Sequence, residues 1–159
     1  DNSVDDFVYK GTDLDESYQM RIYNGSQKYT GSKKLTFGWP EEYKGCFIAD
    51  VFNDDAENWK VEFIQNGVAT PMTRVTKKLR DWCMFAYFIN ENGRSPKNTA
   101  YHTGKLHYWT LPAPCGDPAK EKNWEIRATY TVPTNGRVNV YTANSLQVDY
   151  TGFPATLPE

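Results

Sequence analysis

The chain has 159 residues, enough for one domain that buries a core of its own, and a formal net charge of −2. Its sequence pI near 5.7 offers no positive field for a phosphate backbone or an anionic membrane surface, so neither nucleic acid nor membrane is an expected partner. Aromatic residues make up 15% of the chain, which favours β-strands because flat rings pack well on a pleated sheet.

The N-terminal third predicts short strands joined by long turns. Residues 1–6 are acidic and are expected to be a linker remnant; because no Met or leader precedes Asp1, an excised domain is expected. Strands are predicted over residues 7–10 and 18–23, the second ending at the turn signal Asn24-Gly25-Ser26. Residues 27–44 are predicted to be mostly loop, with one weak strand at 35–37.

The clearest strand patterns lie in the middle of the chain. Residues 46–52 are apolar at odd and even positions alike, which predicts a central strand covered on both faces. Residues 59–65 alternate between apolar and polar side chains before Asn66-Gly67, the pattern of a half-buried strand entering a hairpin. The return strand is predicted over 68–75, with Pro71 placing it at a sheet edge or ending its ladder.

One helix interrupts this series. Apolar residues at positions 79, 82, 83, 86 and 87 have helical spacing, so a short helix is predicted at about residues 76–88. The basic run Lys77-Lys78-Leu79-Arg80 then forms the solvated face of that helix rather than an anion site.

The C-terminal half returns to strands, and the chain as a whole predicts a mostly β fold. A loop is predicted at 90–104, and a stiff Pro-rich connector at 112–118 follows the strand predicted over 105–111. Three more strands are predicted over 124–132, 137–141 and 146–150. About eight short strands predict an antiparallel β-sandwich as a single domain over residues 7–153, with 154–159 a C-terminal tail. Alternation places Trp59, Trp124 and Tyr130 on inward faces.

Residues that could carry chemistry are few. His102 and His107 are five apart, so in one strand they point to opposite faces, and His107 is expected to be a packed or hydrogen-bonded imidazole. The three cysteines allow at most one disulfide and lack the paired spacing of a metal site, so buried inert thiols are expected; they are Cys46, Cys83 and Cys115. No Gly-x-Ser-x-Gly motif and no Gly-rich phosphate loop occurs.

Two acidic clusters, Asp13 to Glu16 and Asp54 to Glu57, have oxygens that a hard cation such as calcium accepts. Neither has the Gly and distal Glu of a helix-loop-helix calcium site. Both are therefore predicted to be solvated acidic turns, with no catalytic and no metal-binding residue in this chain.

Aromatic residues outside the strict alternation are the weak candidates for a binding site. Such rings stack on sugars when exposed, because their apolar faces match the C–H face of a pyranose, and they fill a core or an interdomain contact equally well. A carbohydrate-binding β-sandwich module is thus the alternative function, through Trp39, Tyr43, Trp82, Tyr101 and Trp109.

Several ordered motifs carry a resemblance to a known module. They are Tyr18-Gln19-Met20-Arg21-Ile22-Tyr23, Ile48-Ala49-Asp50-Val51-Phe52-Asn53-Asp54, Asn58-Trp59-Lys60-Val61-Glu62-Phe63 with Asn66-Gly67 and Met72-Thr73-Arg74, Trp124 to Thr129, and the closing pair within Arg137 to Tyr150. In this order they resemble the C-terminal domain that follows the catalytic domain of bacterial calcineurin-like metallophosphoesterases. The stretch from Arg80 to Pro114 departs most from that pattern.

The resemblance implies an accessory role. In that family a divalent metal pair in the preceding catalytic domain activates water, through Asp-x-His, Gly-Asp-x-x-Asp, Gly-Asn-His-Asp or Glu, and Gly-His-x-His motifs. None of these motifs occurs here, so this chain is expected to hold no cofactor. It would instead pack on the N-terminal phosphoesterase domain of the same polypeptide and shape its substrate cleft. The resemblance also implies an exported protein, in the periplasm or at the cell surface.

Overall fold

The computed structural model describes residues 17–30, 36–76, 79, 107–112, 118 and 120–147 of the chain. These residues form ten β-strands and one short 3-10 helix, η1 (Glu41–Tyr43). The strands are β1 (Met20–Asn24), β2 (Lys28–Thr30), β3 (Thr36–Gly38), β4 (Phe47–Val51), β5 (Trp59–Gln65), β6 (Val68–Pro71), β7 (Thr73–Arg74), β8 (Tyr108–Leu111), β9 (Trp124–Thr131) and β10 (Val138–Ala143). Within this part of the chain, no helix has the length and apolar character needed to cross a membrane.

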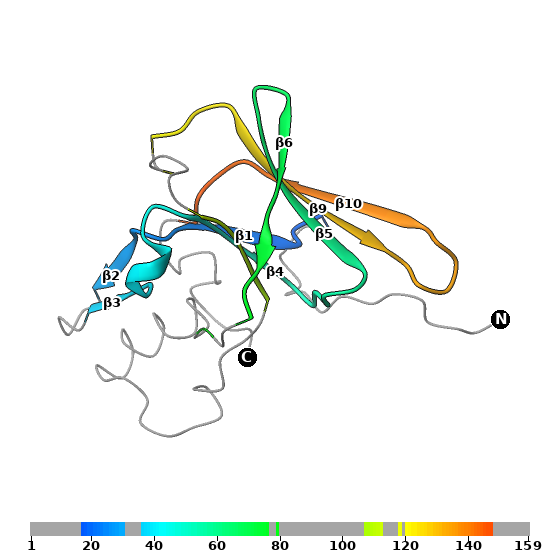
Figure 1. The fold of residues 1–159 in the computed structure, drawn as a ribbon, viewed down its shortest axis with the longest axis horizontal. Coiled ribbons are helices and arrows are strands. Elements are labelled where there is room, and N and C mark those ends of the chain that lie inside the picture. Colours follow the sequence, from blue (N-terminus) through cyan, green and yellow to red (C-terminus); the bar gives the residue numbers. More distant parts are fainter. Residues whose placement is uncertain are drawn as a thin grey trace, which may run out of the picture.

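Eight of the strands form two antiparallel four-stranded sheets. The first sheet has the order β1-β4-β8-β7 and the second has the order β10-β9-β5-β6. Figure 1 shows how the β5–β6 hairpin projects at the top of the molecule and the β9–β10 hairpin at the right, while the small β2–β3 hairpin lies apart at the left. The predicted mostly β, sandwich-like fold of about eight strands is confirmed.

The two sheets meet across one large apolar cluster. Its largest members come from both sheets and include Phe47, Phe63, Trp59, Trp109 and Trp124. The ring centroid of Phe47 lies 4.7 Å from that of Phe63 and 5.0 Å from that of Trp124. This ring of β4 therefore contacts β5 and β9 of the opposite sheet. The predicted inward orientation is confirmed for Trp59 and Trp124, and Tyr130 packs half-buried against the same cluster.

The predicted central strand is also confirmed. All five residues of β4 are buried, and β4 pairs with β1 on one side and with β8 on the other. Its odd residues enter the core between the sheets, whereas Ile48 belongs to a second apolar cluster on the other face. That second cluster contains Tyr23, Cys46, Ile48, Val75, Leu79 and Tyr108, with Trp39 and Tyr43 packed against it.

The predicted Asn66-Gly67 hairpin joins β5 and β6, with Gln65 opposite Val68. Asn66 and Gly67 have φ values of 51° and 78°, the left-handed conformation at both central positions that a two-residue hairpin turn needs. Pro71 is the last residue of β6, which is an edge strand, so the ladder ends where Pro removes a donor.

The predicted strand over 68–75 is divided between the two sheets. Met72 follows Pro71, donates its backbone N–H to Val61 O at 2.9 Å, and buries its side chain in the core. The chain then enters the first sheet as β7, which pairs with β8. A second difference is the β2–β3 hairpin, since residues 27–44 were predicted to be mostly loop with only the β3 strand.

Several predictions lie outside the described residues. They are the linker at 1–6, the strand at 7–10, the helix at about 76–88 except for Thr76 and Leu79, the loop at 90–104, most of the connector at 112–118, the end of the strand at 146–150 and the tail at 154–159. Cys46 is buried, as predicted, and Cys83 and Cys115 lie outside the described residues.

Candidate functional site

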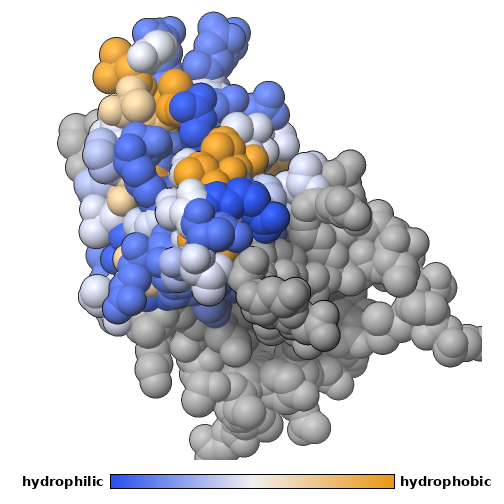
Figure 2. All heavy atoms as spheres, turned by 90° about the vertical axis from the view of Figure 1, so that its right-hand side faces the viewer, coloured by the Kyte–Doolittle hydropathy of each residue, from blue (hydrophilic) through white to orange (hydrophobic). Residues whose placement is uncertain are grey.

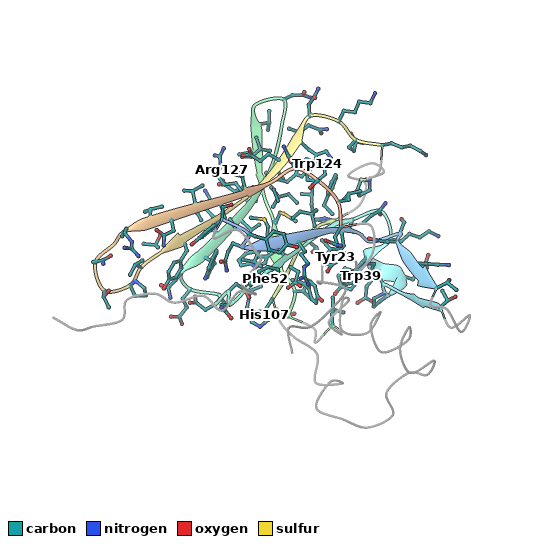
Figure 3. All side chains as sticks on the ribbon, turned by 180° about the vertical axis from the view of Figure 1, so that it is seen from behind. Tyr23, Trp39, Phe52, His107, Trp124 and Arg127 are labelled. Atoms are coloured by element: carbon teal, nitrogen blue, oxygen red, sulfur yellow. The ribbon has the colours of Figure 1, made fainter. Side chains whose placement is uncertain are left out.

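The aromatic residues predicted to form a binding site do not all come together in the structure. Trp39 and Tyr43 pack half-buried on the outer face of the first sheet, where the Trp39 ring lies 5.4 Å from Tyr23 and 5.3 Å from Tyr108. Figure 3 shows Tyr23 and Trp39 side by side. Trp109 belongs to the core on the opposite face, so it does not join them. Trp82 and Tyr101 lie outside the described residues.

Trp109 instead belongs to a polar group that the sequence did not predict. Its indole Nε1 donates a 2.7 Å hydrogen bond to Asp54 Oδ2. Asp54 also accepts from Arg74 Nε at 2.8 Å and lies 2.5 Å from His107 Nδ1. These four residues, Asp54, Arg74, His107 and Trp109, are called the Asp54 cluster below.

The turn between β4 and β5 aims Asp54 inward. Asn53 adopts a left-handed φ of 57°, which Asn tolerates better than most residues, and this bends the chain directly after β4. Asp55 then accepts from the backbone N–H groups of Glu57 and Asn58 at 2.9 and 2.6 Å, and from Asn58 Nδ2 at 3.0 Å. Because Asp55 satisfies the turn itself, the neighbouring carboxylate is free to enter the protein.

The Asp54 side chain is 0% exposed. The prediction of a solvated acidic turn at 54–57 is therefore wrong for Asp54, although Ala56 and Glu57 are exposed. A buried carboxylate needs partners because leaving it unpaired costs several kcal/mol, and here three donors compensate. The expectation that His107 is a packed or hydrogen-bonded imidazole is confirmed.

The electrostatics of the cluster favour the charged form of both titratable members. Burial by itself would raise the pKa of Asp54, but the hydrogen bonds from His107, Arg74 and Trp109 outweigh it and hold that pKa below the ordinary 3.8. The hydrogen bond to Asp54 raises the pKa of His107 above its ordinary 6.5, against the opposing effect of burial. When His107 is protonated, it forms an ion pair with Asp54 beside the Arg74 guanidinium.

Asp54 makes contacts within the protein through both of its carboxylate oxygens. Oδ1 contacts His107, and Oδ2 accepts from Arg74 and Trp109. Across the described ranges, no three or more His, Cys, Asp or Glu side chains are grouped so that they could hold a metal ion. The cluster therefore connects parts of the fold.

A second feature is the outer face of the second sheet. The register of β5, β9 and β10 places Lys60, Glu62, Arg127, Thr129, Val138 and Val140 on it. Val138 and Val140 are each 55% exposed, next to ion pairs of Lys60 with Glu62 at 2.7 Å and of Arg127 with Glu125 at 3.1 Å. Figure 2 views the molecule from the side of the β9–β10 hairpin and shows hydrophobic patches alternating with hydrophilic ones.

A weak signal in the sequence could have indicated the Asp54 cluster. His107 and Trp109 are two apart in a strand and share a face, and a buried indole N–H needs an acceptor. No pattern, however, links Asp54 or Arg74 to that face, because their contacts span 20 to 55 residues of sequence.

Comparison with known proteins gives one match. The family model described as the C terminal of calcineurin-like phosphoesterase matches residues 1–134. The match includes β1 to β9 and ends in the turn before β10. Neither the curated proteins nor the solved structures include a match to this chain.

Proposed function

Because the chain belongs to the C-terminal domain family of calcineurin-like phosphoesterases, we propose that it is a noncatalytic accessory domain that packs on the N-terminal catalytic domain. The family match over residues 1–134 carries this proposal. It is consistent with the contacts of Asp54, a buried acid whose carboxylate accepts from Arg74 and Trp109 and contacts His107 within the fold. The metal pair and the hydrolysis of the phosphoester then belong to the preceding domain.

An activity assay tests the noncatalytic part of the proposal. The isolated chain is incubated with Mn²⁺ and a generic phosphodiester. We expect release of the product at the rate of a buffer blank, because a two-metal mechanism needs ligands that this chain lacks in sequence. Metal-dependent turnover above the blank would contradict the proposal.

The outer face of the second sheet is the surface that we propose for the contact with the catalytic domain. The outer face of the first sheet already carries the second apolar cluster, whereas Val138 and Val140 are exposed beside charged residues. A mixed surface of this kind is typical of contacts between domains of one chain.

Two matched variants test this surface with the two domains prepared as separate proteins. Val140→Arg places an unpaired charge in the contact and should weaken the association measured by calorimetry by about tenfold or more. Val68→Arg is the control, since Val68 is 66% exposed at the β5–β6 hairpin, away from this face. Equal binding by both variants would place the contact elsewhere, and no binding by the unchanged domain would contradict packing.

Shaping of the substrate cleft and export are further parts of the proposal. If the domain shapes the cleft, the two-domain polypeptide should differ from the catalytic domain alone in kcat/KM for large phosphoesters while acting equally on small ones. Export is supported by resemblance to the family. Cell fractionation decides it, and recovery of the full polypeptide in the cytoplasm alone would contradict it.

A further inference from the structure

The Asp54 cluster lies where a long stretch of chain leaves the first sheet and returns to it. Arg74 is the last residue of β7, and His107 directly precedes β8. The two strands pair antiparallel with Arg74 opposite Trp109, and Val75 donates its backbone N–H to Tyr108 O at 2.7 Å. The C-terminal end of β7 and the N-terminal end of β8 are therefore held side by side.

One carboxylate contacts both ends. Asp54 accepts from Arg74 on β7 and contacts His107 and Trp109 at the start of β8. The turn that carries Asp54 is in turn held to the second sheet, because Asn58 O accepts the Thr131 N–H at 2.9 Å. Asp54 thus joins the edge of the first sheet, through side chains, to a turn that a backbone hydrogen bond holds to the second sheet.

We propose that Asp54 and His107 form a pH-sensitive clasp, which holds β7 and the start of β8 on the β4–β5 turn while His107 is protonated and loosens when His107 becomes neutral. This inference goes beyond the proposed accessory function and does not depend on it. An experiment that contradicts one of the two leaves the other standing.

The charges around His107 support the clasp. Among the described residues, it faces Asp54 from the β4–β5 turn, Asp50 from β4 and Arg74 from β7. An imidazolium at His107 is attracted by both carboxylates. When His107 loses its proton, this attraction is lost, and the contact with the fully buried Asp54 side chain is weakened.

Solvent can reach the group that titrates. The His107 side chain is 35% exposed, whereas Asp54 is 0% exposed, so protons exchange at the imidazole without opening the core. The ordinary pKa of histidine is 6.5, and that of His107 is raised in the folded protein. Its contribution to stability is therefore full below pH 6.5 and is lost as pH rises through the folded pKa.

Proton NMR and amide hydrogen exchange on the full chain test the clasp. The imidazole resonances should titrate with a midpoint above 6.5 for His107. As pH rises through that midpoint, the protection factors of the Val75 and Val51 amides, which donate to Tyr108 O and His107 O, should fall several-fold. The Val132 amide, which donates to Arg137 O in the β9–β10 hairpin, should keep its protection factor.

His107→Gln is the decisive variant, because a Gln amide can still donate to Asp54 but does not titrate. It should remove the pH dependence at Val75 and Val51, while His102→Gln, which changes the other histidine of the chain, should keep it. Persistence of the pH dependence in His107→Gln would overturn the clasp. If that variant fails to fold, the unchanged chain still decides, since a His107 midpoint at or below 6.5, or unchanged protection across it, overturns the proposal.

Discussion

Trp59 is the residue at which a packing role and a ligand-binding role predict opposite results. Its ring stacks on Tyr130 and Tyr141 with centroid distances of 5.0 and 5.9 Å, and the side chain is buried in the core between the sheets. Trp59→Ala should therefore cost about 3–5 kcal/mol through the lost burial and the cavity that remains. Thermal denaturation should show one cooperative transition at a clearly lower midpoint.

Val68→Ala is the control for this measurement. Val68 is an exposed apolar residue of the same sheet, and removing exposed methyl groups should change the free energy of unfolding by at most about 0.5 kcal/mol. A midpoint for Trp59→Ala within a degree or two of the parent would mean that the ring is not part of the core. That result would revive a ligand-stacking role for Trp59.

Single residues also differ in how well the sequence predicts their surroundings. Trp59 and Trp124 were predicted correctly because strand alternation alone decides the face of a side chain. Asp54 was not, because its neighbours Asp55 and Glu57 form an acidic turn that is solvated in most proteins. Only the folded chain brings Arg74 and Trp109 within hydrogen-bonding distance of it.

At the scale of elements, the close contact between the end of β1 and η1 depends on Gly25. Gly67, in an open hairpin turn, provides the comparison. A Cβ on Gly25 would lie 1.7 Å from the backbone O of Tyr43, which no side-chain movement can relieve. Gly25→Ala should therefore displace η1 from the end of β1 and cost about 3 kcal/mol or more in chemical denaturation.

Gly67→Ala is the matched substitution. Gly67 has a φ of 78° and open space where the Cβ would lie, so only the left-handed strain of about 1–2 kcal/mol applies. A loss for Gly25→Ala no larger than that for Gly67→Ala would mean that the backbone clash with Tyr43 is relieved at little cost. In that case the close approach of η1 to β1 would contribute nothing measurable.

The elements that were predicted correctly are those whose pattern is local. The β5–β6 hairpin follows from alternation and Asn66-Gly67, and β4 follows from its continuous apolar run. β2 has three residues in a polar, Gly-rich stretch and gains its pairing with β3 only from the fold. The transfer at Met72 from one sheet to the other was likewise not predicted, because it depends on the pairing of β7 with β8, which lies far along the chain.

At the scale of the whole molecule, a sandwich is stable only if its two sheets stay together at their edges as well as through the core. The large apolar cluster joins the centres of the sheets. At one edge Gln147, in the segment after β10, donates its backbone N–H to Ile22 O of β1 at 2.6 Å. At the other edge the chain itself crosses between the sheets at Met72, and Asp54 adds an ionic contact there. The free energy of unfolding of the domain should therefore change with pH, because Asp54 and His107 at this edge titrate.

Acid unfolding tests this dependence through Asp54. Its pKa in the folded protein is held below the ordinary 3.8 by the donors around it, so its contribution is present above pH 3.8 and is lost as pH falls through the folded value. Asp54→Asn should lower the free energy of unfolding at neutral pH by about 2–3 kcal/mol, the usual value for hydrogen bonds to a charged group. The same variant should lose less stability than the parent on going to strong acid, since its amide does not titrate.

Glu57→Gln, in the exposed part of the same turn, should follow the parent at every pH. If Asp54→Asn and the parent lose stability in parallel down to strong acid, the ionic contact at this edge does not contribute to holding the sheets together.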